Sequence, residues 1–171
     1  MTATRTLTTP TARLGGRVTP RQLALDLARR PELWQPHVVF AEPRHYHRLA
    51  SGDDWEAWLL TWLPGQSTGL HDHGGSAGAF AVLAGALNET ILLPRPAEGP
   101  PAPRRFDRLT RRYAPGAVRG FGTQHLHDVV PDGVPSVSLH VYAPRLTAMS
   151  RYVLEDGVLV VTEHERAGVD W

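Results

Sequence analysis

The stretch GQSTGLHDHGGSAGAFAVLAGALNETILL, residues 65–93, carries two signals for the fold. Its second half contains two apolar runs of strand length, at 79–85 and 89–93. Its first half places His71 and His73 two residues apart. Side chains two apart on an extended strand share a face, so both imidazoles can reach one metal ion while Asp72 points away. This pair alone fits a polar turn with two solvated histidines equally well.

Further runs of strand length fill most of the chain, and Gly, Pro, Asn and Asp separate them. They lie at 55–63, 105–111, 117–121, 127–130, 137–142, 150–154 and 158–161. Nine or so short strands at nearly regular spacing indicate an antiparallel sandwich or barrel. Before them, Thr19 and Pro20 have the residue types of a helix start, which predicts one short helix over 20–29 and a second near 31–35.

The composition narrows the class of protein. A chain of 171 residues with 42% hydrophobic residues suits one domain with a core, and we expect a flexible lead over 1–16 and a single domain over 17–171. A formal net charge of +1 without a basic run argues against nucleic acid as a partner. No cysteine is present, so any metal needs His, Asp or Glu ligands.

No signal peptide or membrane-length apolar run is visible, and we expect a cytoplasmic protein.

A third metal ligand can come from a second dense group of histidines. His125 and His127 follow the first pair by some fifty residues. Both would face the same side of a strand, so periodicity does not choose between them. A pair of histidines on one strand and a third on a later strand would give a three-nitrogen site with open positions for other ligands.

Several motifs together resemble one family. His71-Asp72-His73-Gly74-Gly75-Ser76, the run 83–90 (LAGALNET), His127-Asp128-Val129 and the run 137–144 (VSLHVYAP) are similar to bacterial cysteine dioxygenase type I, of the cupin superfamily. The similarity extends from about Arg44 to about Tyr152. It implies an all-β, cupin-type antiparallel barrel of jelly-roll kind after one or two short helices. It also implies ferrous iron, Fe(II), held by His71, His73 and His127, with His127 preferred to His125 because Asp128 and Val129 follow it.

The resemblance leaves the expected ligand set without a carboxylate. Cupins often place a glutamate shortly after the histidine pair, but Ala77 and Gly78 stand there in this chain. Three neutral imidazoles do not neutralise a divalent cation, and such a site favours an anionic ligand such as a thiolate. Mammalian relatives cross-link a cysteine to the family tyrosine. Gly78 takes the place of that cysteine, so no such cross-link is expected here.

The resemblance also assigns roles around the expected metal. Arg48 matches the arginine that pairs with the substrate carboxylate, as a guanidinium can do with two parallel hydrogen bonds. Tyr46 matches a tyrosine near that arginine, and Trp62 a tryptophan that lines the pocket. Tyr142 matches the tyrosine beside substrate and oxygen, and His140 the histidine that holds its hydroxyl. Without the resemblance, we would interpret Arg48 as a surface arginine and Trp62 as a core residue. Tyr142 and His140 would be a buried pair that satisfy each other's hydrogen bonds.

The expected function is oxidation of the thiol of L-cysteine to the sulfinate by both atoms of dioxygen. A 3-mercaptopropionate dioxygenase, in which relatives place a glutamine where Arg48 stands, is the nearest alternative. A non-catalytic cupin that binds a metal or metabolite is the second. Three histidines also suit zinc, nickel or copper, so residue types alone do not select iron. We expect a monomer that binds its small thiol and dioxygen, with no nucleic-acid or membrane partner.

Overall fold

The computed structural model describes residues 19–96, 99 and 104–168, so the lead predicted over 1–16 lies outside the described residues. Helix α1 (Pro20–Ala28) begins as predicted, with the Thr19 side chain accepting a hydrogen bond from the Gln22 amide. Helix α2 (Pro31–Trp34) and a short 3-10 turn η1 (Gln35–His37) follow. No helix within the described residues has the length and apolar character needed to cross a membrane.

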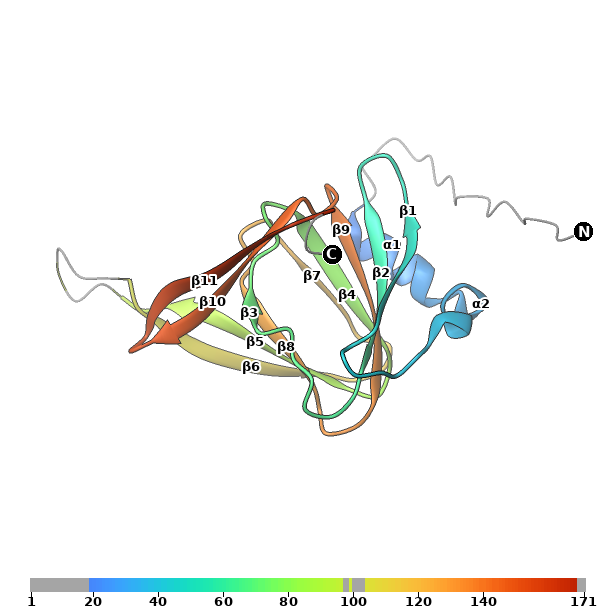
Figure 1. Ribbon diagram of the computed structural model, residues 1–171, viewed down its shortest axis with the longest axis horizontal. Coiled ribbons are helices and arrows are strands. Elements are labelled where there is room, and N and C mark those ends of the chain that lie inside the picture. Colours follow the sequence, from blue (N-terminus) through green and yellow to red (C-terminus); the bar gives the residue numbers. More distant parts are fainter. Residues whose placement is uncertain (1–18, 97–98, 100–103, 169–171) are drawn as a thin grey trace, which may run out of the picture.

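The rest of the described chain forms antiparallel strands, which confirms the predicted β architecture. The strands are β1 (Tyr46–Ser51), β2 (Glu56–Trp62), β3 (Leu70–His71), β4 (Ala77–Ala84), β5 (Leu87–Pro94), β6 (Phe106–Tyr113), β7 (Val118–Phe121), β8 (His127–Pro131), β9 (Ser136–Ala143), β10 (Ala148–Glu155) and β11 (Val158–Arg166). One sheet has the order β1-β2-β9-β4-β7 and the other β11-β10-β3-β8-β5-β6. The two sheets face each other as a barrel, and both helices lie outside the first sheet (Figure 1).

Helix α1 covers the outer face of the first sheet, which explains why its central strands are buried on both faces. Leu23, Ala24 and Leu27 of α1 pack against small and aliphatic residues of β2, β4 and β9. Alternate residues of the same strands face the barrel interior, where Phe80 and Val82 of β4 lie in a second cluster. Because side chains alternate along a strand, a helix on one face leaves the other face for the barrel interior.

The register of the sheets brings distant histidines together. His71 of β3 is the direct partner of His127 on β8, and β10 pairs with β3 on its other side. On β9, His140 and Tyr142 alternate with Leu139 and Val141, which belong to the cluster under α1. His140 and Tyr142 are therefore turned into the barrel, toward the same interior as the β3 and β8 histidines.

Candidate metal centre and adjoining cavity

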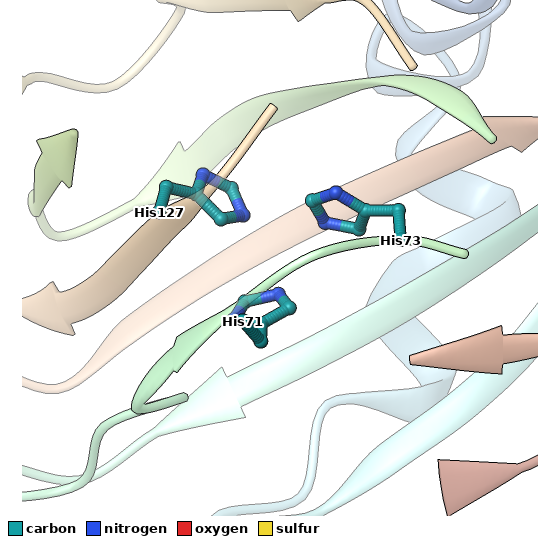
Figure 2. Close-up of side chains that lie close together, drawn as sticks. All are labelled: His71, His73 and His127. Carbon is teal, nitrogen blue, oxygen red and sulfur yellow. The ribbon is translucent and has the colours of Figure 1, made fainter. Parts of the chain in front are cut away.

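Three buried imidazoles meet inside the barrel. His71 ends β3, His73 lies just after it, and His127 begins β8; their rings are turned toward a common space (Figure 2). The ring centroids are 4.9 Å apart for His71 and His73, 4.8 Å for His71 and His127, and 5.0 Å for His73 and His127. One nitrogen from each ring lies within 4.8 Å of the other two. The spacing allows all three to bind one ion after a small closure of the rings.

Two of the three rings have their outer nitrogen occupied. Nδ1 of His71 lies 2.9 Å from the carbonyl oxygen of Gly69, and Nδ1 of His127 lies 2.9 Å from a carboxylate oxygen of Glu89. A carbonyl or carboxylate oxygen only accepts, so each Nδ1 carries the proton and donates it. The neutral ring then keeps the lone pair of Nε2, the nitrogen that a metal would bind.

The ring of His73 lacks hydrogen-bond partners, and this bears directly on whether the site suits a metal. It is 1% exposed, and both of its ring nitrogens are buried without a hydrogen-bond partner. Burial, and then the neighbouring His71 and His127, lower the pKa of His73 far below its ordinary value, so the ring is neutral. A buried, unpaired, neutral imidazole is costly without a ligand, and a metal ion would satisfy it. The donor set therefore fits a divalent transition metal.

Two glycines after His73 allow the turn that joins β3 to β4. Gly74 and Gly75 have φ values of 55° and 91°, in the left-handed region that other residues avoid. A Cβ on Gly74 would lie 2.3 Å from the Ala148 carbonyl oxygen of β10, so the chain passes too close for a side chain. Asp72 faces away from the three rings, as predicted, and accepts the Gly74 amide and the Tyr152 hydroxyl.

Replacing His73 by leucine is expected to stabilise the metal-free protein while removing metal binding. The change deletes two buried unpaired nitrogens, each of the kind that costs about 1–3 kcal/mol, beside the apolar ring of Phe121. Denaturant unfolding of the metal-free chain measures this. His71→Leu is the matched control, because it leaves the Gly69 carbonyl without its donor and is not expected to stabilise. Equal destabilisation by both variants would contradict the expectation.

His125, the alternative third ligand, lies outside the three-ring group. Its Nε2 donates to Glu89 at 2.8 Å, and its ring stacks on Phe121 with centroids 4.7 Å apart. Glu89 is 1% exposed and accepts from both His125 and His127. Burial alone would raise the pKa of Glu89, but those two hydrogen bonds outweigh it and hold the pKa below its ordinary value. A carboxylate thus lies behind the expected ligands, although none lies among them.

A cavity of about 190 Å³ adjoins two of the three rings, those of His71 and His127. Its lining includes His71, His127, His140, Tyr142, Arg44 and Tyr46, with apolar walls from Trp58, Leu60, Leu146 and Met149. Pockets for drug-sized ligands are larger, about 300–1,000 Å³. The cavity therefore suits a small molecule held next to His71 and His127.

Two guanidinium groups line the cavity, those of Arg44 and Arg151, and neither is the one that the resemblance implied. Arg48 is exposed on β1 and does not line the cavity; its guanidinium carbon lies 6.0 Å from the Trp58 ring centroid. Arg44, which precedes β1, does line it. Its guanidinium lies over Trp62 at 4.5 Å, and one nitrogen donates to the Ser67 carbonyl at 2.8 Å. Its Nε is buried and has no hydrogen-bond partner.

The other predicted site residues lie in the cavity wall or behind it. Tyr46 lines the cavity, while Trp62 is fully buried behind it and donates to Ser138 Oγ at 2.9 Å. His140 Nε2 also pairs with Ser138 Oγ, at 2.9 Å. His140 forms no hydrogen bond with the Tyr142 hydroxyl in this structure, and the two ring centroids are 6.5 Å apart. The two side chains still share the cavity wall.

Burial keeps two titratable side chains of this wall, His140 and Tyr142, uncharged. Burial, followed by His127 and Arg44, lowers the pKa of His140 to about 3, so the ring is neutral at ordinary pH. Burial also raises the pKa of the Tyr142 phenol, which keeps its proton. The cavity thus offers a neutral imidazole and a protonated hydroxyl, rather than a base and a phenolate.

Gly78 lies on β4 directly opposite Tyr142 on β9. A Cβ added at Gly78 would lie 2.5 Å from the Phe121 ring, which already fills the space that a side chain would need. The same ring stacks on His73 with centroids 4.8 Å apart. Phe121 therefore takes up the volume beside Tyr142 in a chain that has no cysteine to place there.

Sequence reasoning gave no role to Glu89, Ser138 or Arg44. Glu89 stood within a quoted motif but received no role, because only the pairing of β5 with β8 shows that it reaches His127. Ser138 alternates with His140 and Tyr142, a signal that could have marked it. Arg44 had no signal of its own among 18 arginines.

Comparisons with known proteins agree with this architecture. A family model described as cysteine dioxygenase type I matches residues 23–154. The bovine protein named cysteine dioxygenase type 1 is 22% identical over 144 residues, which cover 81% of this chain and 72% of the bovine one.

Two solved structures share the fold at a TM-score of 0.50 and 13% identity. They are the cupin domain of Schizosaccharomyces pombe Cnp3, with 64% of this chain and 66% of that chain covered, and a Klebsiella pneumoniae protein with a double-stranded β-helix domain, with 75% and 93% covered. The barrel is thus a cupin fold. Since the family model extends from α1 to β10, well over half of the sequence, this chain belongs to the cysteine dioxygenase type I family.

Proposed function

We propose that this protein oxidises the thiol of L-cysteine to the sulfinate with dioxygen, at ferrous iron held by His71, His73 and His127. One observation carries the proposal: three buried imidazoles converge beside a small cavity, and one of them has no other partner for either ring nitrogen. Membership of the cysteine dioxygenase type I family supports the same reaction.

The three rings would supply three neutral nitrogen ligands and leave further coordination positions open to the cavity. Bound there, ferrous iron would supply the redox chemistry that a thiol and dioxygen lack on their own. Neutral ligands do not cancel the charge of a divalent cation, so the site favours a thiolate over a thiol. The buried rings and the small cavity also hold both reactants close together, which replaces an encounter in solution.

Arg44 would bind the substrate carboxylate. It lines the cavity and has an unpaired Nε, whereas the second guanidinium of the wall, Arg151, already makes two hydrogen bonds to Glu165, at 2.5 and 3.2 Å. A guanidinium binds a carboxylate through two parallel hydrogen bonds and so fixes its orientation. Arg48, which the resemblance implies for this role, lies outside the cavity wall and is the comparison residue.

Tyr142 would donate a hydrogen bond to the oxygen end of the reacting molecules. Its phenol is protonated and lines the cavity, so it can stabilise negative charge that develops there. His140 would position the cavity wall through Ser138, to which its Nε2 is paired. The Trp62 side chain donates to the same hydroxyl, and this fixes the Ser138 side chain.

Oxygen uptake with two thiols tests the proposal. The iron-loaded chain is expected to consume dioxygen with L-cysteine at a higher kcat/KM than with 3-mercaptopropionate, and to form the sulfinate. Equal or better turnover of 3-mercaptopropionate would refute the choice of substrate and favour the alternative reaction. No uptake with either thiol, despite bound iron, would refute the enzyme and favour a binding protein.

A further inference from the structure

The carboxylate of Glu89 is buried behind His127 and takes four donors. Oε1 accepts the Nδ1–H of His127 at 2.9 Å and the Nε2–H of His125 at 2.8 Å. Oε2 accepts the hydroxyl of Tyr113 at 3.0 Å and the Nε–H of Arg119 at 3.3 Å. Its side chain is 1% exposed, so water does not screen these contacts. Four donors, one of them a guanidinium, keep a buried carboxylate charged.

This contact makes the three metal-facing imidazoles unequal. His127 donates its outer proton to an anion, His71 donates to the neutral carbonyl of Gly69, and His73 donates to nothing. A hydrogen bond to a carboxylate draws the proton away from the ring and raises the electron density on the opposite nitrogen. The nitrogen of His127 that would bind a metal is therefore expected to be the strongest donor of the three.

We propose that Glu89 is a positioning residue that fixes the ring of His127 and, through its charge, sets the affinity of the site for metal and the reduction potential of the bound iron. The inference rests on the metal site of the proposed function. The register supports it, because Glu89 on β5 faces Val129 of β8, two residues from His127 on the same side of the strand. Arg119 of β7 and Tyr113 of β6 hold the carboxylate through Oε2, the oxygen that His127 does not contact.

Glu89, His125 and His127 also lie close enough to bind a cation of their own. Two contacts of Glu89 disfavour a cation at this second position. The guanidinium of Arg119 would repel a cation at the same carboxylate, and His127 would have to give up the proton it shares with Glu89. A second ion is therefore the alternative outcome of the test.

The test compares Glu89→Gln with Asp132→Asn. Glutamine keeps the size and one acceptor but removes the charge. Asp132 is the matched control, because it loses a carboxylate paired with Arg112 on the outside of the barrel. Chelator competition on the purified chain is expected to give about 10–100-fold weaker metal binding for Glu89→Gln. Its iron(III)/iron(II) potential should move to more positive values, and Asp132→Asn should change neither.

A second variant predicts a shift of the opposite sign. Tyr113→Phe removes one donor from Glu89 without removing its charge, so more of that charge acts on His127. The potential is then expected to move to more negative values. A role in folding alone would lower thermal stability in both variants and leave the metal affinity and the potential of the folded protein unchanged.

The outcomes separate this inference from the proposed function. Unchanged affinity and potential in Glu89→Gln, with one ion bound per chain, would overturn the inference alone. Two ions per chain in the wild type, one of them lost in Glu89→Gln, would replace it by a second metal site. A wild-type chain that binds no metal would overturn both the inference and the proposed reaction.

Discussion

Alanine at His71, His73 or His127 is expected to lower the affinity for ferrous iron by more than about 100-fold, the upper range for losing a hydrogen bond behind a ligand. Each change removes one of the three converging nitrogens. Two imidazoles and the cavity leave an incomplete ligand set, so thiol oxidation should fall to the background rate. Metal content after gel filtration and oxygen uptake with L-cysteine measure the two effects.

Two other histidines serve as controls for that loss. His37→Ala removes a partly exposed ring that stacks on His47, away from the cavity, and should leave iron content and activity unchanged. His125→Ala removes a donor from Glu89 but no metal-facing nitrogen, and iron should remain bound. Loss of iron in His125→Ala with retention in His127→Ala would reverse the assignment of the third ligand. Circular dichroism confirms that each variant is folded.

Arg44→Gln is expected to raise the KM for L-cysteine by at least about 30-fold, since removing one partner of a buried charge pair costs about 2–5 kcal/mol. The Arg44 guanidinium lies in the cavity wall with an unpaired Nε, whereas Arg151 is already paired with Glu165, so an entering carboxylate is expected to bind Arg44. Arg48→Gln should change the KM little, because that side chain is exposed and outside the wall. Steady-state oxygen uptake measures both.

Cysteamine is a thiol that resembles L-cysteine but lacks the carboxylate. Its turnover shows whether Arg44→Gln affects only the binding of the carboxylate or disturbs the whole site. Its turnover should be similar in the wild type and in Arg44→Gln, because there is no carboxylate for Arg44 to hold. A large rise in KM for L-cysteine in Arg48→Gln, with none in Arg44→Gln, would return the role to the residue that the sequence resemblance implies.

The strands were predictable where side chains alternate or form apolar runs of strand length. The predicted helix over 20–29 and the nine runs appear with shifts of a few residues at their ends. Two strands were not predicted. β1 (Tyr46–Ser51) carries polar and charged residues on its exposed face, and β3 (Leu70–His71) is too short to show a period. The order of strands in each sheet depends on long-range pairing, which no local pattern contains.

The metal-facing residues were predictable only in part. Spacing placed His71 and His73 together, but it did not distinguish His125 from His127, since both share one side of the chain. The structure separates them by register: His127 pairs directly with His71, and His125 lies outside β8 against Phe121. The position of Arg44 was not predictable from strand periodicity, because Arg44 precedes β1 and reaches the cavity from a segment without regular structure.

A reaction under isotope-labelled dioxygen shows where the oxygen atoms of the product come from. The chain, loaded with one ferrous ion, reacts with L-cysteine under labelled gas, and mass spectrometry reads the product. We expect a sulfinate in which both new oxygen atoms carry the label, formed by the wild type but not by His127→Ala. Disulfide alone, or a sulfinate with an oxygen atom from water, would contradict it.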